Sequence, residues 1–487
     1  MTGELAAAIR DLRTAVGAQR VLTDPLQCRT YECDGLTHFR VSPAVVVLAE
    51  CTDHVRATLR ICSAHRVPYV ARGSGTGLSG GALPVADGVL LVLSRMREIV
   101  ELDIDNQRAV VEPGVINLSV TRAVASQGYF YAPDPSSQQV CSIGGNVAEN
   151  SGGAHCLKYG FTTHHVTGAV VVLPDGSLVH LGGKVIESPG YDLLGAFVGS
   201  EGTLGVATEV TLRLVRQPEH IQTLLAGFRS VTDAAGTVSD IIAAGVVPAA
   251  VEMMDRLAIE AAEAATHCGY PPGADSILVV EVDGSAAEVA AHFADVRRIA
   301  DARGAFEIRV AADDAERALI WKGRKSAFAA VGRISPNYLV QDGVIPRTAL
   351  PDVLREIGRI SADCGVRVAN VFHAGDGNLH PLVLYDDAVA GETGRAMEAN
   401  GRILDLCIAY GGSVTGEHGV GADKVAYMGR QFTPEDLDTM QRVRCAFDPA
   451  GVSNPGKVFP TPRLCGEAPG ARSGVHPLQE AGLAAVF

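Results

Sequence analysis

The sequence predicts an α+β protein with more than one domain. Its 487 residues are enough for two or three domains and a large core. Residues 41–218 alternate short apolar strands with glycine-rich loops, whereas residues 219–370 alternate long alanine-rich helices with strands. Apolar residues make up 47% of the chain and charged residues 20%, which is typical of a folded globular protein.

The composition also limits the partners. A net charge of -14 disfavours nucleic acid and anionic membranes as main partners. We expect no signal peptide, because the first residues lack a basic region followed by an apolar core, and no apolar run reaches the ~20 residues of a membrane span. We therefore expect a cytoplasmic protein. Its 11 cysteines are scattered, which predicts reduced and mostly buried thiols, and without a C-x-x-C array we expect no iron–sulfur cluster on this chain.

The first elements lead to a glycine-rich loop. Residues 1–40 form an N-terminal lead-in, with one amphipathic helix and then a polar loop. A buried strand at 45–48, a helix at 53–66 and a second strand at 67–71 follow. The second strand runs into Arg72-Gly-Ser-Gly-Thr-Gly-Leu-Ser-Gly-Gly81, which has five glycines in ten residues.

Successive backbone N–H groups of such a loop can turn toward one anion, as in phosphate-binding nests. The loop is not a P-loop, because no Gly-Lys-Ser/Thr follows it. Nor does it open a helix as Gly-x-Gly-x-x-Gly does, because a strand at 89–93 comes next. A phosphate cradle and a plain flexible loop both remain open.

Three further segments of small residues follow: the turn Pro133-Asp-Pro-Ser136, residues 142–153 and residues 198–205. Four such segments within roughly 130 residues allow the backbone to lie close along a long, flat, polar ligand. The alternative is an ordinary glycine-rich α+β domain, since glycine accounts for 54 residues.

The stretch from Val371 to Val383 predicts a hairpin with a pair of histidines. Asp376-Gly377 is a two-residue turn signal flanked by apolar residues. A hairpin closed there places His373 directly opposite His380, with Cβ atoms roughly 4.5–5.5 Å apart. Two imidazoles at that separation can chelate one metal ion. The alternative is a pair of polar residues on a solvated strand face.

A second segment, Thr415-Gly-Glu-His-Gly-Val-Gly421, adds a carboxylate and another imidazole. His373, His380 and Glu417 would make three protein ligands and leave a position open, as catalytic metal sites do. His418 would then be available for proton transfer.

A helix is predicted over residues 314–331, with Arg324 in the middle of its apolar stripe. A buried guanidinium needs an anionic partner, and its fork suits a carboxylate. That carboxylate could belong to a ligand or to an internal Asp or Glu. Alternatively, the head of Arg324 could reach solvent.

These motifs, with Asn454-Pro-Gly-Lys457, together resemble one family. It is the FAD-linked 2-hydroxy-acid dehydrogenases of the vanillyl-alcohol-oxidase type, which include D-lactate and D-2-hydroxyglutarate dehydrogenases and the glycolate oxidase flavin subunit. The resemblance covers residues 20–460. It implies a two-subdomain FAD-binding domain at 41–218 and an α+β substrate or cap domain at 219–415. A C-terminal segment at 416–460 would return to the flavin, and 461–487 would be a flexible tail.

The resemblance also assigns the flavin contacts. The glycine loop would hold the FAD pyrophosphate, and later segments would line the adenosine and the isoalloxazine. The loop contains neither His nor Cys, so the implied FAD is non-covalent. The residues assigned in this way are Arg72, Gly73, Ser74, Gly75, Thr76, Gly77, Pro133, Ser136, Gly144, Gly145, Asn146, Glu201, Gly202 and Asn454.

The implied activity is oxidation of a 2-hydroxy acid to a 2-oxo acid. Arg324 would bind the substrate carboxylate, zinc or manganese would sit on His373, His380 and Glu417, and His418 would be the general base. Electrons would leave to a non-NAD acceptor: an iron–sulfur partner subunit, an electron-transfer flavoprotein or a quinone. Such a partner would be the route to peripheral attachment at the inner membrane. A homodimer and a hetero-complex both remain open.

Two departures from the family pattern bear on the substrate. D-2-hydroxyglutarate dehydrogenases have a lysine where this chain has Gln341, and an asparagine where it has Leu382. Without those groups a second carboxylate is costly to bury, which favours glycolate or D-lactate over D-2-hydroxyglutarate. The alternatives of other classes are a flavin-free metallohydrolase, a non-catalytic flavin subunit and an aromatic-alcohol oxidase.

Overall fold

The computed structural model describes residues 3–185 and 190–460. The chain divides into two compact units. Unit 1 takes in the described residues up to Gly152, Phe161–Arg216 and those from Glu417 onward, and unit 2 takes in Gly153–Gly160 and Gln217–Gly416. Both contain helices and strands, so the α+β prediction is confirmed. The tail predicted at 461–487 lies outside the described residues.

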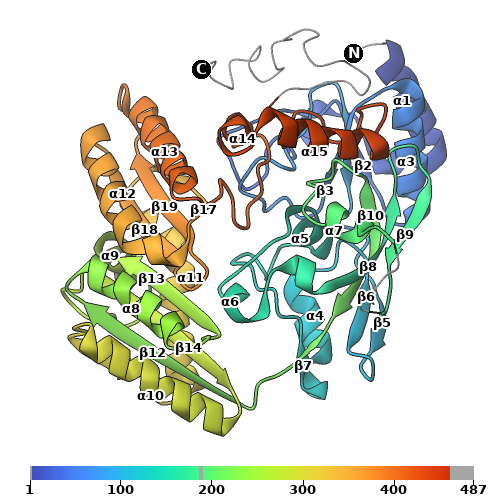
Figure 1. The fold of residues 1–487 in the computed structure, drawn as a ribbon. Coiled ribbons are helices and arrows are strands. Elements are labelled where there is room, and N and C mark those ends of the chain that lie inside the picture. The colour runs from blue at the N-terminus through green and yellow to red at the C-terminus, as the bar shows by residue number, and fades with distance from the viewer. Residues whose placement is uncertain (1–2, 186–189, 461–487) are drawn as a thin grey trace. The chain divides into compact units, whose positions relative to one another are not determined.

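Unit 1 is built from short elements (Figure 1). Its α-helices are α1 (Gly3–Val16), α2 (Pro25–Arg29), α3 (Thr52–His65), α4 (Asn117–Val124), α5 (Ile143–Glu149), α7 (Leu193–Phe197), α14 (Val425–Gln431) and α15 (Pro434–Phe447). Its strands are β1 (Val21–Leu22), β2 (Val45–Leu48), β3 (Tyr69–Arg72), β4 (Val89–Val92), β5 (Ile99–Asp103), β6 (Arg108–Val111), β7 (Tyr129–Phe130), β8 (Val166–Val172), β9 (Leu178–Gly182), β10 (Val206–Arg213) and β11 (Val215–Arg216).

Two main sheets organise unit 1. A four-stranded sheet has the order β1-β2-β4-β3, and its β2, β4 and β3 are parallel. A five-stranded antiparallel sheet has the order β5-β6-β10-β8-β9, and β7 pairs with β11 apart from it. Strands β2 and β4 are buried throughout, as expected for strands covered on both faces.

The lead-in departs from the prediction in one respect. The segment expected to be a polar loop contains β1 and the one-and-a-half-turn helix α2. The side chain of Asp24 accepts a hydrogen bond from the Leu26 N–H at 2.8 Å and caps α2, and Pro25 follows as its first residue. Both elements are too short to give a periodic signal in the sequence.

Among the described residues, the cysteines agree with the prediction except at Cys445. Free thiols are found at Cys28, Cys33, Cys51, Cys62, Cys141, Cys156, Cys268, Cys364 and Cys407, and most are buried. Cys445, in contrast, is disulfide-bonded, so the prediction of a reduced thiol is wrong there.

Unit 2 is one large sheet with helices on both faces. Its strands are β12 (His220–Phe228), β13 (Ala250–Asp255), β14 (Ser276–Gly284), β15 (Glu307–Val310), β16 (Asn337–Val340), β17 (Gly343–Val344), β18 (Arg367–His373) and β19 (Asn378–Tyr385). Its α-helices are α6 (Cys156–Tyr159), α8 (Val231–Ala243), α9 (Arg256–Thr266), α10 (Ala286–Ala302), α11 (Asp314–Val331), α12 (Leu350–Cys364) and α13 (Glu392–Ala409).

The sheet of unit 2 has eight strands in the order β15-β12-β14-β13-β18-β19-β16, with β17 also paired to β19. Helices α8, α10, α12 and α13 cover one face, and α9 and α11 pack on the other (Figure 1). Because side chains alternate along each strand, neighbouring residues of one strand enter two different cores.

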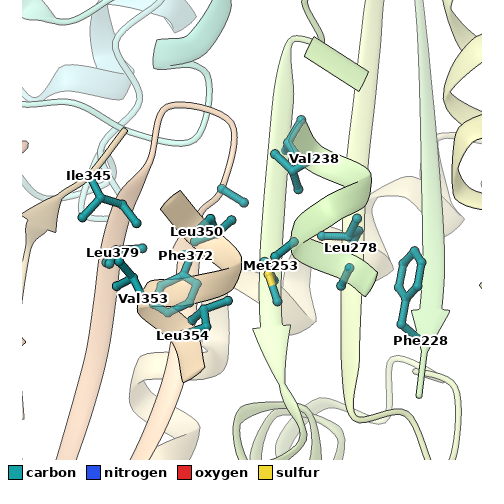
Figure 2. Close-up of a cluster of buried hydrophobic side chains, with 14 of the residues drawn as sticks. Phe228, Val238, Met253, Leu278, Ile345, Leu350, Val353, Leu354, Phe372 and Leu379 are labelled. Carbon is teal, nitrogen blue, oxygen red and sulfur yellow. The ribbon is translucent and has the colours of Figure 1, made fainter. Parts of the chain in front are cut away.

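The face under α8, α10, α12 and α13 is apolar. Phe228, Met253, Leu278, Phe372 and Leu379 project from five different strands into this core (Figure 2). All five are at most 1% exposed. The residues of this core carry no charge, whereas the other face of the sheet holds buried charged groups.

The face under α9 and α11 mixes apolar residues with buried charge. Ala250, Met254 and Val279 contribute to its core, but Glu252 and Glu281 project from the same face and are each 1% exposed. A buried carboxylate is costly unless it is paired and hydrogen-bonded.

Glu281 is satisfied by donors from several elements. The guanidinium of Arg317 donates to it through Nε and Nη2 at 2.9 and 3.0 Å, and Trp321 Nε1 donates at 2.7 Å. Burial raises the pKa of Glu281, but the hydrogen bonds from His155 and Arg317 outweigh burial, and the pKa is lowered overall.

His155 belongs to the short segment Gly153–Gly160, and this segment is held in unit 2 by charge. Nζ of Lys158 pairs with the carboxylate of Asp283 and donates to its backbone oxygen at 2.6 Å. The hydroxyl of Tyr159 donates to the same carboxylate at 2.5 Å. Eight residues whose neighbours in sequence belong to unit 1 are thereby bound to β14.

In the part of the chain that the structure describes, no helix has the length and apolar character needed to cross a membrane.

Truncating a core side chain should test the apolar face. We expect Phe228→Ala to lower the free energy of unfolding of unit 2 by about 3–5 kcal/mol, because Phe228 is fully buried and the neighbouring residues cannot fill the cavity. Urea denaturation followed by far-UV circular dichroism measures the change. Met397→Ala, at a side chain on α13 that is 49% exposed, is the control and should change the stability by less than about 0.5 kcal/mol. Equal effects of the two substitutions would contradict the assignment of this core.

Candidate functional site

The histidine hairpin forms, but its register differs from the predicted one. Strands β18 and β19 are antiparallel, His373 lies opposite Asn378, and His380 lies opposite Val371. The prediction that His373 directly opposes His380 is therefore wrong. Because side chains alternate with a period of two, the two-residue shift leaves both histidines on the same face.

The shift arises because the turn is longer than predicted. Four residues, from Ala374 to Gly377, connect the strands. The Gly377 N–H donates to the His373 carbonyl at 3.2 Å, and the Asn378 N–H donates to Asp376 Oδ1 at 3.0 Å. Gly377 has φ = 83°, and a Cβ there would lie 2.2 Å from the Ile345 carbonyl oxygen, so this position requires glycine.

Both histidines are buried. His373 is 4% exposed and His380 is 1% exposed, so the alternative of a solvated strand face is wrong. Their ring centroids are 5.1 Å apart and the rings are nearly perpendicular. The Phe328 ring from α11 packs edge-on against His380 at 5.8 Å. Two buried imidazoles in contact are suited to holding one metal ion.

Asp342, which the sequence did not single out as a site residue, lies beside this pair. Its side chain is fully buried, and Oδ1 is 3.7 Å from His380 Nε2. Thr415 donates its hydroxyl to the same carboxylate, and the Gly416 N–H donates to the Asp342 carbonyl at 2.9 Å. Asp342 therefore anchors the backbone immediately before Glu417.

Arg324 projects from α11 toward the same face of the sheet. It is 2% exposed, and its Nη2 lies 2.5 Å from Glu252 Oε2. The alternative of an internal carboxylate partner is thus observed, and the alternative of a head that reaches solvent is wrong. Among the described residues, the Arg324 Nε–H has no hydrogen-bond acceptor. A buried guanidinium with an unused donor is equipped to receive an anion.

Glu252 also contacts His373, one of the two histidines. It lies directly opposite His373 on the neighbouring strand, and its Oε1 is 2.8 Å from His373 Nδ1. The sequence analysis missed Glu252. The sequence does contain a signal for it, a single carboxylate inside the apolar run from Ala250 to Met254. A carboxylate in a buried strand needs hydrogen-bonding or charged partners, so its presence there indicates a polar site.

Glu417 and His418 belong to unit 1, because the division between the units falls directly after Gly416. Both side chains are half-buried, and Glu417 Oε1 is 3.6 Å from His418 Nε2. A Cβ on Gly152 would lie 2.9 Å from Glu417 Oε2, so glycine at position 152 leaves room for this carboxylate.

The glycine loop of unit 1 has the properties of an anion cradle. Gly75 has φ = 71°, and a Cβ on Gly73 would lie 2.0 Å from Ser142 Oγ, so both positions require glycine. The Ser74 N–H donates to this Ser142 hydroxyl at 3.3 Å. Within the described part of the chain, the N–H groups of Gly75, Thr76 and Gly77 donate to no protein acceptor. These N–H groups remain available for a phosphate.

Asn117, absent from the sequence-based assignments, joins two segments expected to line the flavin. Its side-chain Nδ2 donates to the Pro133 carbonyl at 3.1 Å and to Asn146 Oδ1 at 3.0 Å. Asn117 is 1% exposed and Asn146 is 3% exposed.

A Cβ on Gly144 would lie 2.6 Å from Pro113, which explains the small residue at that position of α5. Gly145 also lies in α5, whereas Ser136 is exposed.

The C-terminal segment joins the remaining assigned residues. Asn454 Nδ2 donates to the Gly81 carbonyl at 3.0 Å and to the Glu201 carbonyl at 2.6 Å. The Ser453 hydroxyl donates to the Gly202 carbonyl at 2.9 Å. Arg72 turns instead toward the lead-in, where Nη1 donates to the Cys33 carbonyl at 2.6 Å.

Buried charges lie close to these residues. The carboxylate of Glu201 accepts the N–H groups of Val420 and Gly421, both at 2.7 Å, yet burial raises its pKa. Burial raises the pKa of Asp34 to about 6 and lowers that of Lys457 to about 8. Desolvation therefore dominates the electrostatics of this region.

Comparison with protein families places both units. Residues 43–182 match the model of an FAD-binding domain, and residues 217–458 match that of the C-terminal domain of FAD-linked oxidases. The chain is 51% identical to glycolate oxidase subunit GlcD of Escherichia coli K12 over 456 residues, which are 94% of this chain and 91% of the relative. The chain belongs to the FAD-linked oxidases.

Other members of the family are also similar. GlcD of Bacillus subtilis is 40% identical over 88% of this chain and 92% of its own length. A D-lactate dehydrogenase of Archaeoglobus fulgidus is 33% identical over 85% of this chain and 91% of its own length. This FAD-linked oxidase is therefore a flavoprotein, and a flavin-free metallohydrolase is not supported.

The fold is shared with more distant flavoproteins. A 4-ethylphenol oxidase from Gulosibacter chungangensis superposes with a TM-score of 0.79 at 20% identity, covering 94% of this chain and 98% of the other. p-Cresol methylhydroxylase gives 0.78 at 18% identity, covering 94% and 97%. The predicted vanillyl-alcohol-oxidase type of fold is confirmed.

Substitution of Asn117 should test the arrangement of the flavin segments. We expect Asn117→Ala to lower the free energy of unfolding by about 1–3 kcal/mol, because Pro133 and Asn146 lose a buried donor. The FAD content of the purified protein should fall with it, as measured by the ratio of flavin to protein absorbance. Asn106→Ala, which removes an amide from an exposed turn of the same unit, should retain its FAD. Full FAD retention in Asn117→Ala would show that this link does not order the flavin segments.

Proposed function

We propose that this FAD-linked oxidase converts a small 2-hydroxy acid, glycolate or D-lactate, to the corresponding 2-oxo acid and passes the electrons to a non-NAD acceptor. The observation that carries the proposal lies within unit 2. A buried arginine with an unused donor, Arg324, and two buried histidines in contact, His373 and His380, occupy the same face of one sheet. Arg324 would bind a carboxylate, and a metal ion on the two histidines would bind the adjacent hydroxyl of the same substrate.

The FAD would be held non-covalently. Support comes from the loop between Arg72 and Gly81, which contains no His or Cys but offers unpaired backbone N–H groups from Gly75 to Gly77. The full set of contacts proposed is Arg72, Gly73, Ser74, Gly75, Thr76, Gly77, Pro133, Ser136, Gly144, Gly145, Asn146, Glu201, Gly202 and Asn454.

The metal ligands would be His373, His380 and Glu417. Two neutral imidazoles and a carboxylate suit zinc or manganese equally, so the ligand set leaves the choice between the two ions open. When bound, the ion would supply a Lewis acid for the hydroxyl oxygen, and FAD an acceptor for the hydride leaving the substrate Cα.

The protein groups would act around these cofactors. Arg324 would bind the substrate carboxylate, which fixes the position of the adjacent Cα. His418 would accept the hydroxyl proton as general base, a role that histidine side chains often fill in enzymes. The interior position of the site on the sheet excludes water from Arg324 and strengthens its attraction for the carboxylate.

The substrate would carry one carboxylate. Leu382 is fully buried on the same face as His380, and Gln341 is 1% exposed. Neither residue offers a charge to a second carboxylate, whose burial would then be costly. D-2-hydroxyglutarate is the alternative substrate. Relatives that the chain is similar to are named glycolate oxidase subunit and D-lactate dehydrogenase, which supports the choice of a small 2-hydroxy acid.

The electron acceptor would be a separate protein or a quinone. The word "subunit" in the name of the GlcD relatives supports a partner chain, and an iron–sulfur protein or an electron-transfer flavoprotein would fit that role. The location we propose is cytoplasmic, with peripheral attachment at the inner membrane wherever such a partner provides it.

Anaerobic mixing of the purified protein with glycolate, D-lactate, L-lactate or D-2-hydroxyglutarate should test the substrate. We expect glycolate or D-lactate to bleach the flavin absorbance band. Prior removal of the metal with a chelator should abolish bleaching, and added Zn²⁺ or Mn²⁺ should restore it. Bleaching by D-2-hydroxyglutarate alone would show that the assignment from Gln341 and Leu382 is wrong. Bleaching by none of the four would contradict the substrate class.

The substitution Arg324→Lys should test the carboxylate site. Lysine keeps a positive charge beside Glu252 but loses the guanidinium fork. We expect kcat/KM to fall by roughly 10- to 150-fold, which corresponds to losing a charge-assisted hydrogen bond worth about 1.5–3 kcal/mol. Most of the change should appear in KM.

The matched control is Arg317→Lys. Arg317 lies on the same helix and is also paired with a buried carboxylate, that of Glu281. Its kcat/KM should stay within about twofold of the wild-type value. A similar loss in both variants would indicate damage to α11 rather than loss of a substrate contact.

A further inference from the structure

One buried carboxylate links the two groups of the proposed site in unit 2. Glu252 is 1% exposed and uses both oxygens: Oε1 is 2.8 Å from His373 Nδ1, and Oε2 is 2.5 Å from Arg324 Nη2. Its partners come from different elements, since His373 ends β18 and Arg324 lies in the middle of α11. Glu252 itself is opposite His373 in the strand register, which fixes their separation.

This geometry determines which nitrogen of His373 carries a proton. A carboxylate can only accept hydrogen bonds, so the proton must be on Nδ1. The neutral ring then has its lone pair on Nε2, the nitrogen that would bind a metal ion. A carboxylate behind a ligating imidazole also fixes the orientation of the ring and raises its basicity.

We propose that Glu252 is a positioning residue that prepares His373 as a metal ligand and holds Arg324 in place for the substrate carboxylate. The inference deepens the proposed function, on which it rests, by making a single side chain responsible for both subsites. Glu252 would contact neither substrate nor metal and would act through His373 and Arg324, the two residues that do.

The arrangement requires a carboxylate rather than an amide. In Glu252→Gln the amide oxygen can accept from only one side, and the charged guanidinium of Arg324 is the stronger donor. The amide NH₂ group then faces His373 Nδ1 and donates to it, which moves the ring proton to Nε2. The substitution therefore leaves the shape of the side chain almost unchanged and presents the wrong tautomer of His373 to the metal.

The sheet provides a matched comparison in Glu281. It is also 1% exposed, lies on the same face one strand away, and pairs with an arginine of α11 and a histidine, Arg317 and His155. Neither of these partners is among the proposed metal ligands. Glu281→Gln thus imposes the same loss of a buried charge without touching His373.

The test compares Zn²⁺ binding by the FAD-loaded wild-type protein, Glu252→Gln and Glu281→Gln. Each protein is stripped with a chelator and titrated with Zn²⁺ in competition with a chromophoric chelator, at matched FAD content. We expect the Kd for Zn²⁺ to rise about 10- to 100-fold in Glu252→Gln and to stay near the wild-type value in Glu281→Gln. In Glu252→Gln, KM for the hydroxy acid should rise as well, because Arg324 loses its charged partner.

The outcomes separate this inference from the proposed function. Wild-type Zn²⁺ affinity in Glu252→Gln, or an equal loss in both variants, would overturn the role of Glu252 while leaving the metal site standing. A wild-type protein that binds no Zn²⁺ would overturn the metal site and the inference together.

Glu252→Asp provides the test if Glu252→Gln does not retain FAD. Aspartate keeps the charge but is one methylene shorter, so it cannot span both partners. We expect an intermediate loss of Zn²⁺ affinity with full FAD content. Unchanged affinity in Glu252→Asp would overturn the inference.

Discussion

Unit 2 depends on the neutralisation of two carboxylates buried under one helix. Glu252 and Glu281 project from neighbouring strands, and Arg324 and Arg317 of α11 neutralise them. The two arginines are seven residues apart, so two helical turns bring both to the same side of α11. Removing one partner of such a pair typically costs about 3–5 kcal/mol, because the other charge stays buried. These pairs therefore fix where α11 lies on the sheet, and with it the positions of Arg324 and Phe328.

Well-packed apolar residues would hold α11 at least as firmly, because burying a charge pair is rarely a net gain in stability. The opposite face of the same sheet follows that simpler solution, with Phe228, Leu278 and Phe372 in a core without charge. The sheet thus separates its tasks: one face supplies stability, and the other can hold polar groups in fixed positions. Fixed polar groups are what catalysis by preorganisation requires.

Much of the fold could be predicted from the sequence because periodicity is a local property. The strand at 45–48 and the helix over 314–331 have the predicted bounds. The register of β18 and β19 was harder to predict. The Asp-Gly signal suggested a two-residue turn, but Gly377 contacts Ile345, which is distant in sequence, and this contact favours a four-residue turn. The histidine pair was nonetheless predicted correctly, because a shift of two residues in the strand pairing leaves both histidines on the same face of the sheet.

The residues that the sequence did not reveal have a common property. Glu252, Asp342 and Asn117 are all buried polar residues whose partners lie far away in the chain. Nothing in their immediate neighbours defines those partners, so spacing alone could not identify them. The glycine loop and Arg324 were visible for the opposite reason, since an unusual local composition or an interrupted apolar stripe marks them.

The path of the chain limits how this protein could exchange parts with its relatives. The backbone passes between the units after Gly152, Gly160, Arg216 and Gly416, four times in all. A graft of Gln217–Gly416 alone would omit the eight residues that pair with Glu281 and Asp283, and would leave both carboxylates short of donors in the recipient. Recombination between family members should therefore succeed only when Gly153–Gly160 and Gln217–Gly416 come from the same parent protein. Substitutions in these two segments should accordingly be correlated in evolution.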